Sequence, residues 1–311
     1  MADIAQADDL QEPDELETAL AVIRKNAGNE AVAGRIFDSV LNEIVKRHHR
    51  TVFWGDRLLT IDKSAGFRNK PGFKELLAEV DPNKGCNQYA SPDRLSWRLH
   101  TMIWAASCAF KVPGDFIECG VTHGDMPWVI TEALDFKSTG KSFYAYDTFD
   151  GFDFRYSSEQ DFPEAPQFFH ALHEESRQDP RRHEKVASRF AGKPYVKIIK
   201  GVVPDILREM APDRVAFLHL DMNAPMAQKG ALEVLFDRLS PGAVVIFDDY
   251  GWFLYHREKE VADAFFEARG HSVLELPTGQ GLVIVQKQSS NRNSGAAGGI
   301  SRLFRRKSDS P

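Results

Sequence analysis

The sequence predicts an α/β protein built around a doubly wound, mostly parallel sheet of seven strands with helices on both faces. Two observations support this fold class. From about residue 113 onward, short runs rich in β-branched and aromatic residues alternate with runs whose apolar residues recur at helical spacing. The strand-like runs are almost continuously apolar, as expected for strands covered on both faces. Ligands of such a sheet bind beyond the carboxyl ends of its strands.

The alternating pattern locates the elements of this domain, which spans 113–287. Strands are expected at 115–119, 143–147, 196–200, 215–221 and 243–248. Helices are expected at about 125–137, from Pro204, at 225–239 and at 258–269. Two final strands, 272–276 and 281–286, flank the turn sequence PTGQG and are expected to form an antiparallel hairpin.

A helical preface, 16–112, is expected before this domain. Apolar residues recur at helical spacing in Glu30–Arg47 and Asp93–Lys111. Packing against the sheet, or against a second subunit in a homodimer, explains the apolar face of the second helix. The acidic lead-in 1–15 and the basic tail 288–311 are expected to be disordered. The tail has an alternative interpretation, since its apolar and basic residues allow one amphipathic turn on an acidic membrane or partner.

Composition indicates a soluble, cytoplasmic globular protein. The chain has 311 residues, 42% of them hydrophobic, and its net charge of -6 provides no overall basic surface for nucleic acid. Its three cysteines have no metal-type spacing, and an odd count argues against a secreted disulfide framework. The N-terminus lacks the pattern of a signal peptide. No apolar run approaches the roughly 20 residues of a membrane-spanning helix, so stable membrane insertion is not expected.

Two strand ends suggest a nucleotide-like ligand. The first strand is followed by Gly120 and Gly124, which allow a tight turn and close approach of a ligand to the backbone. Their G-x-x-x-G spacing differs from the dinucleotide fingerprint, and many such turns contain glycines for conformational reasons alone. Asp147 ends the second strand, where nucleotide-binding α/β proteins hold ribose hydroxyls. A helix or turn cap is the other interpretation of this aspartate.

Carboxylates gather at the next two strand ends. His219, Asp221 and Asn223 alternate and should share one face of the sheet, while Asp248 and Asp249 follow the apolar run AVVIF. Buried adjacent carboxylates require a cation or strong donors. Oxygen ligands of this kind suit Mg²⁺. In the alternative interpretation, one aspartate caps the following helix and the other is solvated.

These motifs together resemble those of a known family, and the resemblance covers about residues 52–286. The matching runs are WRLHTMIWAAS, GDFIECGVTHG, YAYDTFDGF, FLHLDMN, LSPGAVVIFDDYGW and LPTGQGLVIV. They occur in the order found in the macrocin O-methyltransferase (TylF-like) family. Its members are Rossmann-like class I methyltransferases that use S-adenosylmethionine, and they include Mg²⁺-dependent enzymes that methylate sugar hydroxyls of macrolide and aminocoumarin antibiotics.

The resemblance implies an S-adenosylmethionine- and Mg²⁺-dependent O-methyltransferase acting on a sugar hydroxyl of a glycoconjugate, surface polysaccharide or natural product. It implies cofactor contacts from Glu118, Gly120, Val121, Gly124, Asp147, Thr148 and Phe149. It implies that Asp221, Asp248 and Asp249 bind the metal, which would align the acceptor's hydroxyls and lower the pKa of the attacking one.

The general base is not fixed by the resemblance. His170, His173 and His183 lie in the polar stretch 153–195, which we interpret as a lid that binds the acceptor, and Asp221 is a comparable candidate. Asn223 stands where some relatives carry a further acid. A non-catalytic methyltransferase-like protein that binds a nucleotide or glycan in a biosynthetic assembly is therefore a second hypothesis. A nicotinamide-dependent sugar dehydrogenase is a third, although the dinucleotide glycine pattern is missing.

Overall fold

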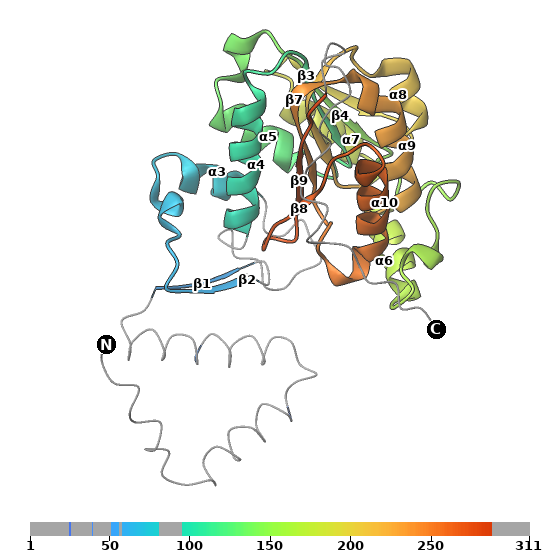
Figure 1. Ribbon diagram of the computed structural model, residues 1–311, viewed down its shortest axis with the longest axis horizontal. Helices are drawn as coiled ribbons and strands as arrows, with labels where there is room; N and C mark the ends of the chain where they lie inside the picture. Colours follow the sequence, from blue (N-terminus) through green and yellow to red (C-terminus); the bar gives the residue numbers. More distant parts are fainter. Residues whose placement is uncertain (1–24, 26–38, 40–50, 56–57, 81–94, 288–311) are drawn as a thin grey trace, which may run out of the picture.

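The computed structural model describes residues 25, 39, 51–55, 58–80 and 95–287, and a seven-stranded sheet lies at its centre (Figure 1). The strand order is β5-β4-β3-β6-β7-β9-β8. The strands are β3 (Asp115–Cys119), β4 (Phe143–Asp147), β5 (Val196–Lys200), β6 (Val215–Leu220), β7 (Leu239–Phe247), β8 (Leu274–Glu275) and β9 (Gly281–Ile284). Strands β3 to β7 are parallel, and β9 runs antiparallel to both β7 and β8. The predicted fold class, with its C-terminal antiparallel hairpin, is confirmed.

The chain enters this sheet at its centre. Strand β3 pairs with β4 on one side and with β6 on the other, so the chain first runs outward to β5 and then returns to continue at β6. The connections that leave β3 and β6 therefore run toward opposite edges of the sheet. A crevice forms at such a switch point, at the carboxyl ends of the strands, and this is where ligands of open α/β sheets bind.

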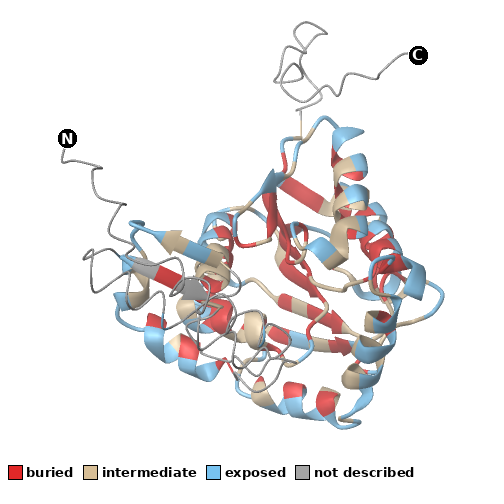
Figure 2. Ribbon diagram, turned by 90° about the horizontal axis from the view of Figure 1, so that it is seen from below, coloured by how far each residue is buried: buried red, intermediate tan, exposed pale blue. Residues whose placement is uncertain are grey.

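Helices cover both faces of the sheet. On one face, α8 (Asp205–Met210), α9 (Pro225–Leu235) and α10 (His256–Glu267) pack on the strands in one apolar cluster. On the other face, α4 (Ser96–Ala109), α5 (Asp125–Ala133) and α7 (Arg182–Arg189) pack in a second cluster. Buried residues concentrate in the strands and on the helix faces turned toward them (Figure 2). Helices α5 and α9 end before their expected ends and are followed by the short 3-10 helices η3 (Phe136–Thr139) and η5 (Phe236–Arg238). Strand β7 starts four residues before its expected start.

The part of the preface that the structure describes is not entirely helical. It contains an antiparallel pair, β1 (Val52–Gly55) and β2 (Leu58–Ile61), followed by η1 (Gly66–Asn69), α3 (Phe73–Glu79) and α4. The hairpin has a sequence signal, because VFWG and LLTI are two strand-like runs separated by only two residues. The expected helix Glu30–Arg47 and the two tails lie outside the described residues. Among the described helices, none has both the length and the apolar character needed to cross a membrane.

The polar stretch 153–195 is folded. It contains η4 (Glu159–Asp161), α6 (Pro166–Arg177) and α7. Helix α6 carries Phe169 on its buried side, and α7 buries Val186 against the second apolar cluster of the sheet. This stretch is therefore attached to the α/β domain through an apolar interface.

Candidate active site at the carboxyl ends of the strands

A cavity of about 260 Å³ lies at the carboxyl ends of β3, β4, β5 and β6. One wall, which we call the inner wall, comes from the loops after these strands and includes Gly120, Thr122, Asp147, Thr148, Val202, Asp221 and Asn223. The opposite wall, the outer wall, comes from the segment that follows β4 and includes Gly151, Tyr156, Ser157, Glu175 and Arg182. The cavity thus occupies the position at which this fold class binds its ligands.

Gly120 is required where the loop after β3 crosses the end of β6. Its φ is +91°, and a Cβ atom there would lie 1.7 Å from the backbone oxygen of Asp221. The backbone can therefore reach the cavity only without a side chain at this position. Gly124, with φ +78°, precedes α5, and a Cβ atom would meet the ring of Phe190 at 2.9 Å. Gly124 thus serves helix packing and does not line the cavity.

Asp147 connects the two loops that follow β3 and β4. Its Oδ2 accepts hydrogen bonds from the backbone N–H groups of Val121 (2.7 Å) and Thr122 (2.9 Å), and its Oδ1 accepts one from Phe149 (2.6 Å). A carboxylate offers about four acceptor positions, so about one remains for a ligand. Both interpretations of Asp147 therefore have a structural basis, because it caps a turn and also lines the cavity. Thr148 lines the cavity, whereas the side chains of Val121 and Phe149 pack in the apolar cluster.

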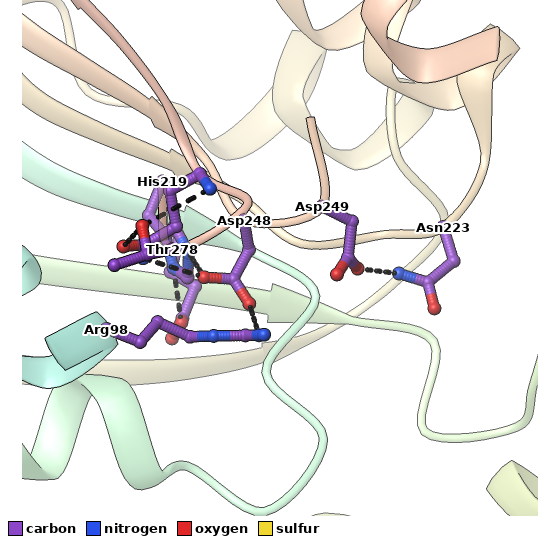
Figure 3. Close-up of polar contacts among 8 residues, drawn as sticks. Arg98, His219, Asn223, Asp248, Asp249 and Thr278 are labelled. Atoms are coloured by element: carbon purple, nitrogen blue, oxygen red, sulfur yellow. Dashed lines mark hydrogen bonds and ion pairs between the residues drawn. The ribbon is translucent and has the colours of Figure 1, made fainter. Parts of the chain in front are cut away.

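A chain of buried charges runs behind the inner wall (Figure 3). Glu118 Oε1 lies 2.8 Å from His219 Nδ1, and His219 Nε2 lies 3.6 Å from Asp248 Oδ1. Burial raises the pKa of Glu118 to about 7. Burial alone would lower the pKa of His219, but the carboxylates of Asp248 and Glu118 outweigh it and raise the pKa to about 10. Glu118 is thus an interior partner of a histidine cation and is not part of the cavity lining.

Asp248 has protein partners on both of its carboxylate oxygens. Arg98 of α4 forms an ion pair with its Oδ2, and Gln280 Nε2 donates to its Oδ1 at 3.0 Å. Thr278 Oγ1 in turn donates to Gln280 Oε1 at 3.0 Å. Burial alone would raise the pKa of Asp248, but Arg98 and His219 outweigh it and hold the pKa well below its usual value. Asp248 is therefore ionised and fixed on both oxygens.

Asp221 is in the opposite situation. Within the described ranges, no hydrogen bond or ion pair involves its half-buried carboxylate, which lines the cavity. Burial, followed by repulsion from Asp248 and Asp249, raises its pKa well above the usual value. One ligand atom each from Asp221, Asp248 and His219 lies within 4.8 Å of the others. A carboxylate without a partner beside other acids fits a bound cation.

Asp249 is turned toward Asn223 and away from Asp248 (Figure 3). Asn223 Nδ2 donates to Asp249 Oδ2 at 2.7 Å. Asn223 has a φ of +52° and lies beyond the end of β6, so it does not continue the alternation of His219 and Asp221. Of the three carboxylates expected to bind metal, the structure thus brings Asp221 and Asp248 together with His219, and Asp249 lies beside this group.

The histidines of the polar stretch do not line the cavity. His170 is 65% exposed and lies 3.5 Å from a carboxylate oxygen of Glu159. His173 Nδ1 accepts a hydrogen bond from the backbone of Phe152 (3.1 Å), and its ring stacks on that side chain. Neither imidazole lines the cavity, so Asp221 is the one base candidate expected from the sequence that does, and His123 of the loop after β3 is a further histidine in the lining. The ring of His183 lies 5.0 Å from that of Phe149.

Four residues of this site were not identified from the sequence, namely Arg98 and Gln280, which contact Asp248, and Ser157 and Arg182, which line the cavity. Arg98 precedes the buried Leu99 on a largely apolar helix, and a basic residue beside such a face is a weak signal of a buried ion pair. Gln280 lies in a turn, and a turn sequence gives no information on the direction of its side chains.

Three comparisons with known proteins show what this chain is similar to. The family model described as Macrocin-O-methyltransferase (TylF) matches residues 95–272. A protein of Streptomyces olivaceus, named 8-demethyl-8-(2,3-dimethoxy-alpha-L-rhamnosyl)-tetracenomycin-C 4'-O-methyltransferase, is 28% identical over 169 residues, which cover 51% of this chain. The chain matches only 59% of the length of that relative. The solved structure of the O-methyltransferase NovP superposes with a TM-score of 0.51 at 18% identity, covering 61% of this chain and 80% of NovP, and this likeness concerns the fold alone.

Proposed function

This chain belongs to the macrocin-O-methyltransferase (TylF) family, and from that premise we propose that it is an S-adenosylmethionine-dependent O-methyltransferase of sugar hydroxyls. One observation carries the proposal. Asp221 presents a carboxylate without a protein partner, among the described residues, to a cavity at the switch point of the sheet. A carboxylate at this position can accept the proton of an acceptor hydroxyl.

The inner wall suits the cofactor. S-adenosylmethionine supplies an electrophilic methyl group, so the protein has to bind and orient rather than activate it. Gly120 lets the backbone approach the ligand, and the remaining acceptor position of Asp147 would bind a ribose hydroxyl. Thr148 and Val202 line the cavity beside Asp147 and would contact the adenosyl side.

The carboxylates support a divalent cation at the same site. Asp221, Asp248 and Asp249 would hold it through oxygen atoms, and such a cation lowers the pKa of a bound hydroxyl. Asp221 would be its principal protein ligand, because Asp248 is shared with Arg98 and Gln280 and Asp249 accepts from Asn223. This residue set favours modest affinity for Mg²⁺.

The acceptor class rests on the relative from Streptomyces olivaceus, whose name describes methylation of a rhamnosyl group. We propose a sugar hydroxyl of a glycoconjugate, surface polysaccharide or natural product as the acceptor of this chain.

The test combines binding and turnover. Calorimetric titration with S-adenosylhomocysteine, in Mg²⁺ and in EDTA, should give binding under both conditions. Methyl transfer to a panel of rhamnosides should require Mg²⁺, and Asp221→Asn should lower kcat by about 100- to 10,000-fold while retaining cofactor binding. Asp213→Asn, an exposed aspartate just before the other end of β6, is the matched control and should be as active as the wild type. Turnover of Asp221→Asn at the wild-type rate would refute the role of Asp221.

A second function is favoured by one specific observation. Two of the three carboxylates expected to bind metal already have protein donors, Asp248 from Arg98 and Gln280, and Asp249 from Asn223. In a non-catalytic methyltransferase-like protein that binds a nucleotide or glycan, the carboxylates would be paired with protein donors in this way and would need no metal. Such a protein would bind S-adenosylhomocysteine without any influence of Mg²⁺ and would transfer no methyl group to any glycan.

A further inference from the structure

The outer wall of the cavity contains two buried polar atoms that have no hydrogen-bond partner in the part of the chain that the structure describes. They are Nε of Arg182 and Oγ of Ser157. Arg182 is 7% exposed and Ser157 is 5% exposed, and both residues line the cavity. Buried donors are almost always paired in folded proteins, so two unpaired ones in residues that line the same cavity point to polar groups of a ligand.

Both side chains are held by well-anchored elements. The loop that carries Ser157 is attached to the first turn of α8, where Asp205 accepts from the hydroxyl of Tyr156 (2.8 Å) and pairs with Arg155 (2.9 Å). Arg182 Nη2 donates to the backbone oxygen of Glu175 in α6 at 3.1 Å. The outer wall is thus a preformed surface, and its unpaired atoms are fixed relative to the strand ends.

The far end of α7 is anchored to the loop after β3. Arg189 Nη1 donates to Asp125 at 2.5 Å and to the backbone oxygen of His123 at 3.1 Å. At the near end, the ring of His183, next to Arg182, lies 5.0 Å from the ring of Phe149 in the loop after β4. Arg182, next to His183 in the sequence, is therefore held near the loop that follows β4.

We propose that Arg182 and Ser157 bind the adenosyl part of S-adenosylmethionine, so that the segment after β4 recognises the cofactor. This inference rests on the proposed function. The guanidinium Nε–H can donate to a purine ring nitrogen or a ribose oxygen, and the serine hydroxyl can donate or accept at the adenine edge. Asp147, Asp153, Glu175 and Asp221 make the same cavity acidic, which suits a cationic cofactor and opposes a phosphate-bearing acceptor in this space.

The test compares two ligands that share the adenosyl group. S-adenosylhomocysteine carries an amino-acid carboxylate, and methylthioadenosine lacks it. Calorimetric titration of Arg182→Met should show about 10- to 100-fold weaker binding of both ligands, and Ser157→Ala a smaller loss for both. Arg181→Met, at the exposed arginine next in sequence, is the matched control and should bind both ligands like the wild type. Thermal unfolding of each variant without ligand checks the fold, and Ser157→Ala with Arg182→Lys carries the test if Arg182→Met is unfolded.

Three results would overturn the inference. If Arg182→Met and Ser157→Ala bind both ligands like the wild type, the outer wall does not contact the cofactor, although the proposed function stands. If only S-adenosylhomocysteine binding weakens, Arg182 contacts the amino-acid carboxylate and not the adenosyl part. If the wild type binds neither ligand, the proposed function fails and this inference fails with it.

Discussion

Replacing Arg98 with methionine should destabilise the protein strongly, because it removes one partner of a buried ion pair. Asp248 is 2% exposed and Arg98 is 12% exposed. Removing one member of such a pair leaves a buried charge uncompensated, which typically costs about 3–5 kcal/mol. Asp248 would retain the hydrogen bond from Gln280 and the His219 cation at 3.6 Å, so we expect the lower end of that range, about 3 kcal/mol.

Thermal unfolding followed by circular dichroism provides the assay. For a domain of this size, about 3 kcal/mol corresponds to a decrease in Tm of roughly 6–12 °C. Arg177→Met is the matched control, since its ion pair with Asp150 is on the surface and should contribute little. The double variant with Asp248→Asn measures the coupling between the two side chains, which we expect to be about 2–3 kcal/mol.

Two results would refute this reasoning. An Arg98→Met protein with the Tm of the wild type would mean that Asp248 needs no cation from α4. Strictly additive effects of Arg98→Met and Asp248→Asn would mean that the two side chains do not interact.

Two further predictions concern the backbone and a buried acid. Gly120→Ala should lower the free energy of unfolding by more than about 2 kcal/mol and abolish S-adenosylhomocysteine binding, because the new Cβ would collide with the backbone of Asp221. The control is Gly140→Ala, which is also at positive φ but has open space around it, so it should cost only backbone strain. Burial, and then the charge of Asp249, raise the pKa of Glu258 from 4.5 to about 8. Between about pH 5 and pH 8 the native state therefore keeps Glu258 protonated while the unfolded state loses that proton, so the stability of the wild type should fall as the pH rises through this range. Glu258→Gln keeps an acceptor for the Ala224 N–H. Its free energy of unfolding in urea should equal that of the wild type near pH 5 and be about 2–4 kcal/mol higher at pH 8. Equal pH profiles of the two proteins would contradict the raised pKa.

The sheet was predictable because its signal is local. The inner parallel strands are apolar runs that are largely buried on both faces, and all five parallel strands fall where the sequence places them. The proximity of Asp221 and Asp248 was predictable for a related reason, since the carboxyl ends of neighbouring parallel strands meet at one edge of the sheet.

The direction of individual side chains was not predictable in the same way. The alternation predicts that Asn223 continues β6, but the chain leaves the strand and adopts a positive φ there. Arg98 meets Asp248 across 150 positions of sequence, and no local pattern encodes that contact. Ser157 and Arg182 lie in a polar stretch without strong periodicity, so only the folded structure shows that both line the cavity.

The buried charges explain why two neighbouring aspartates differ so much. Glu118, His219, Asp248 and Arg98 alternate in sign from β3 through β6 and β7 to α4, and the two cations keep Asp248 ionised. Burial, and then the negative charge of Asp248, raise the pKa of Asp221, whose carboxylate forms no ion pair within the described residues. Pairs of acids whose surroundings push their pKa values apart are the usual means by which a site separates a fixed charge from a proton acceptor. In the function proposed above, Asp248 would supply the fixed charge, and Asp221 would be the carboxylate that meets an acceptor hydroxyl or a divalent cation.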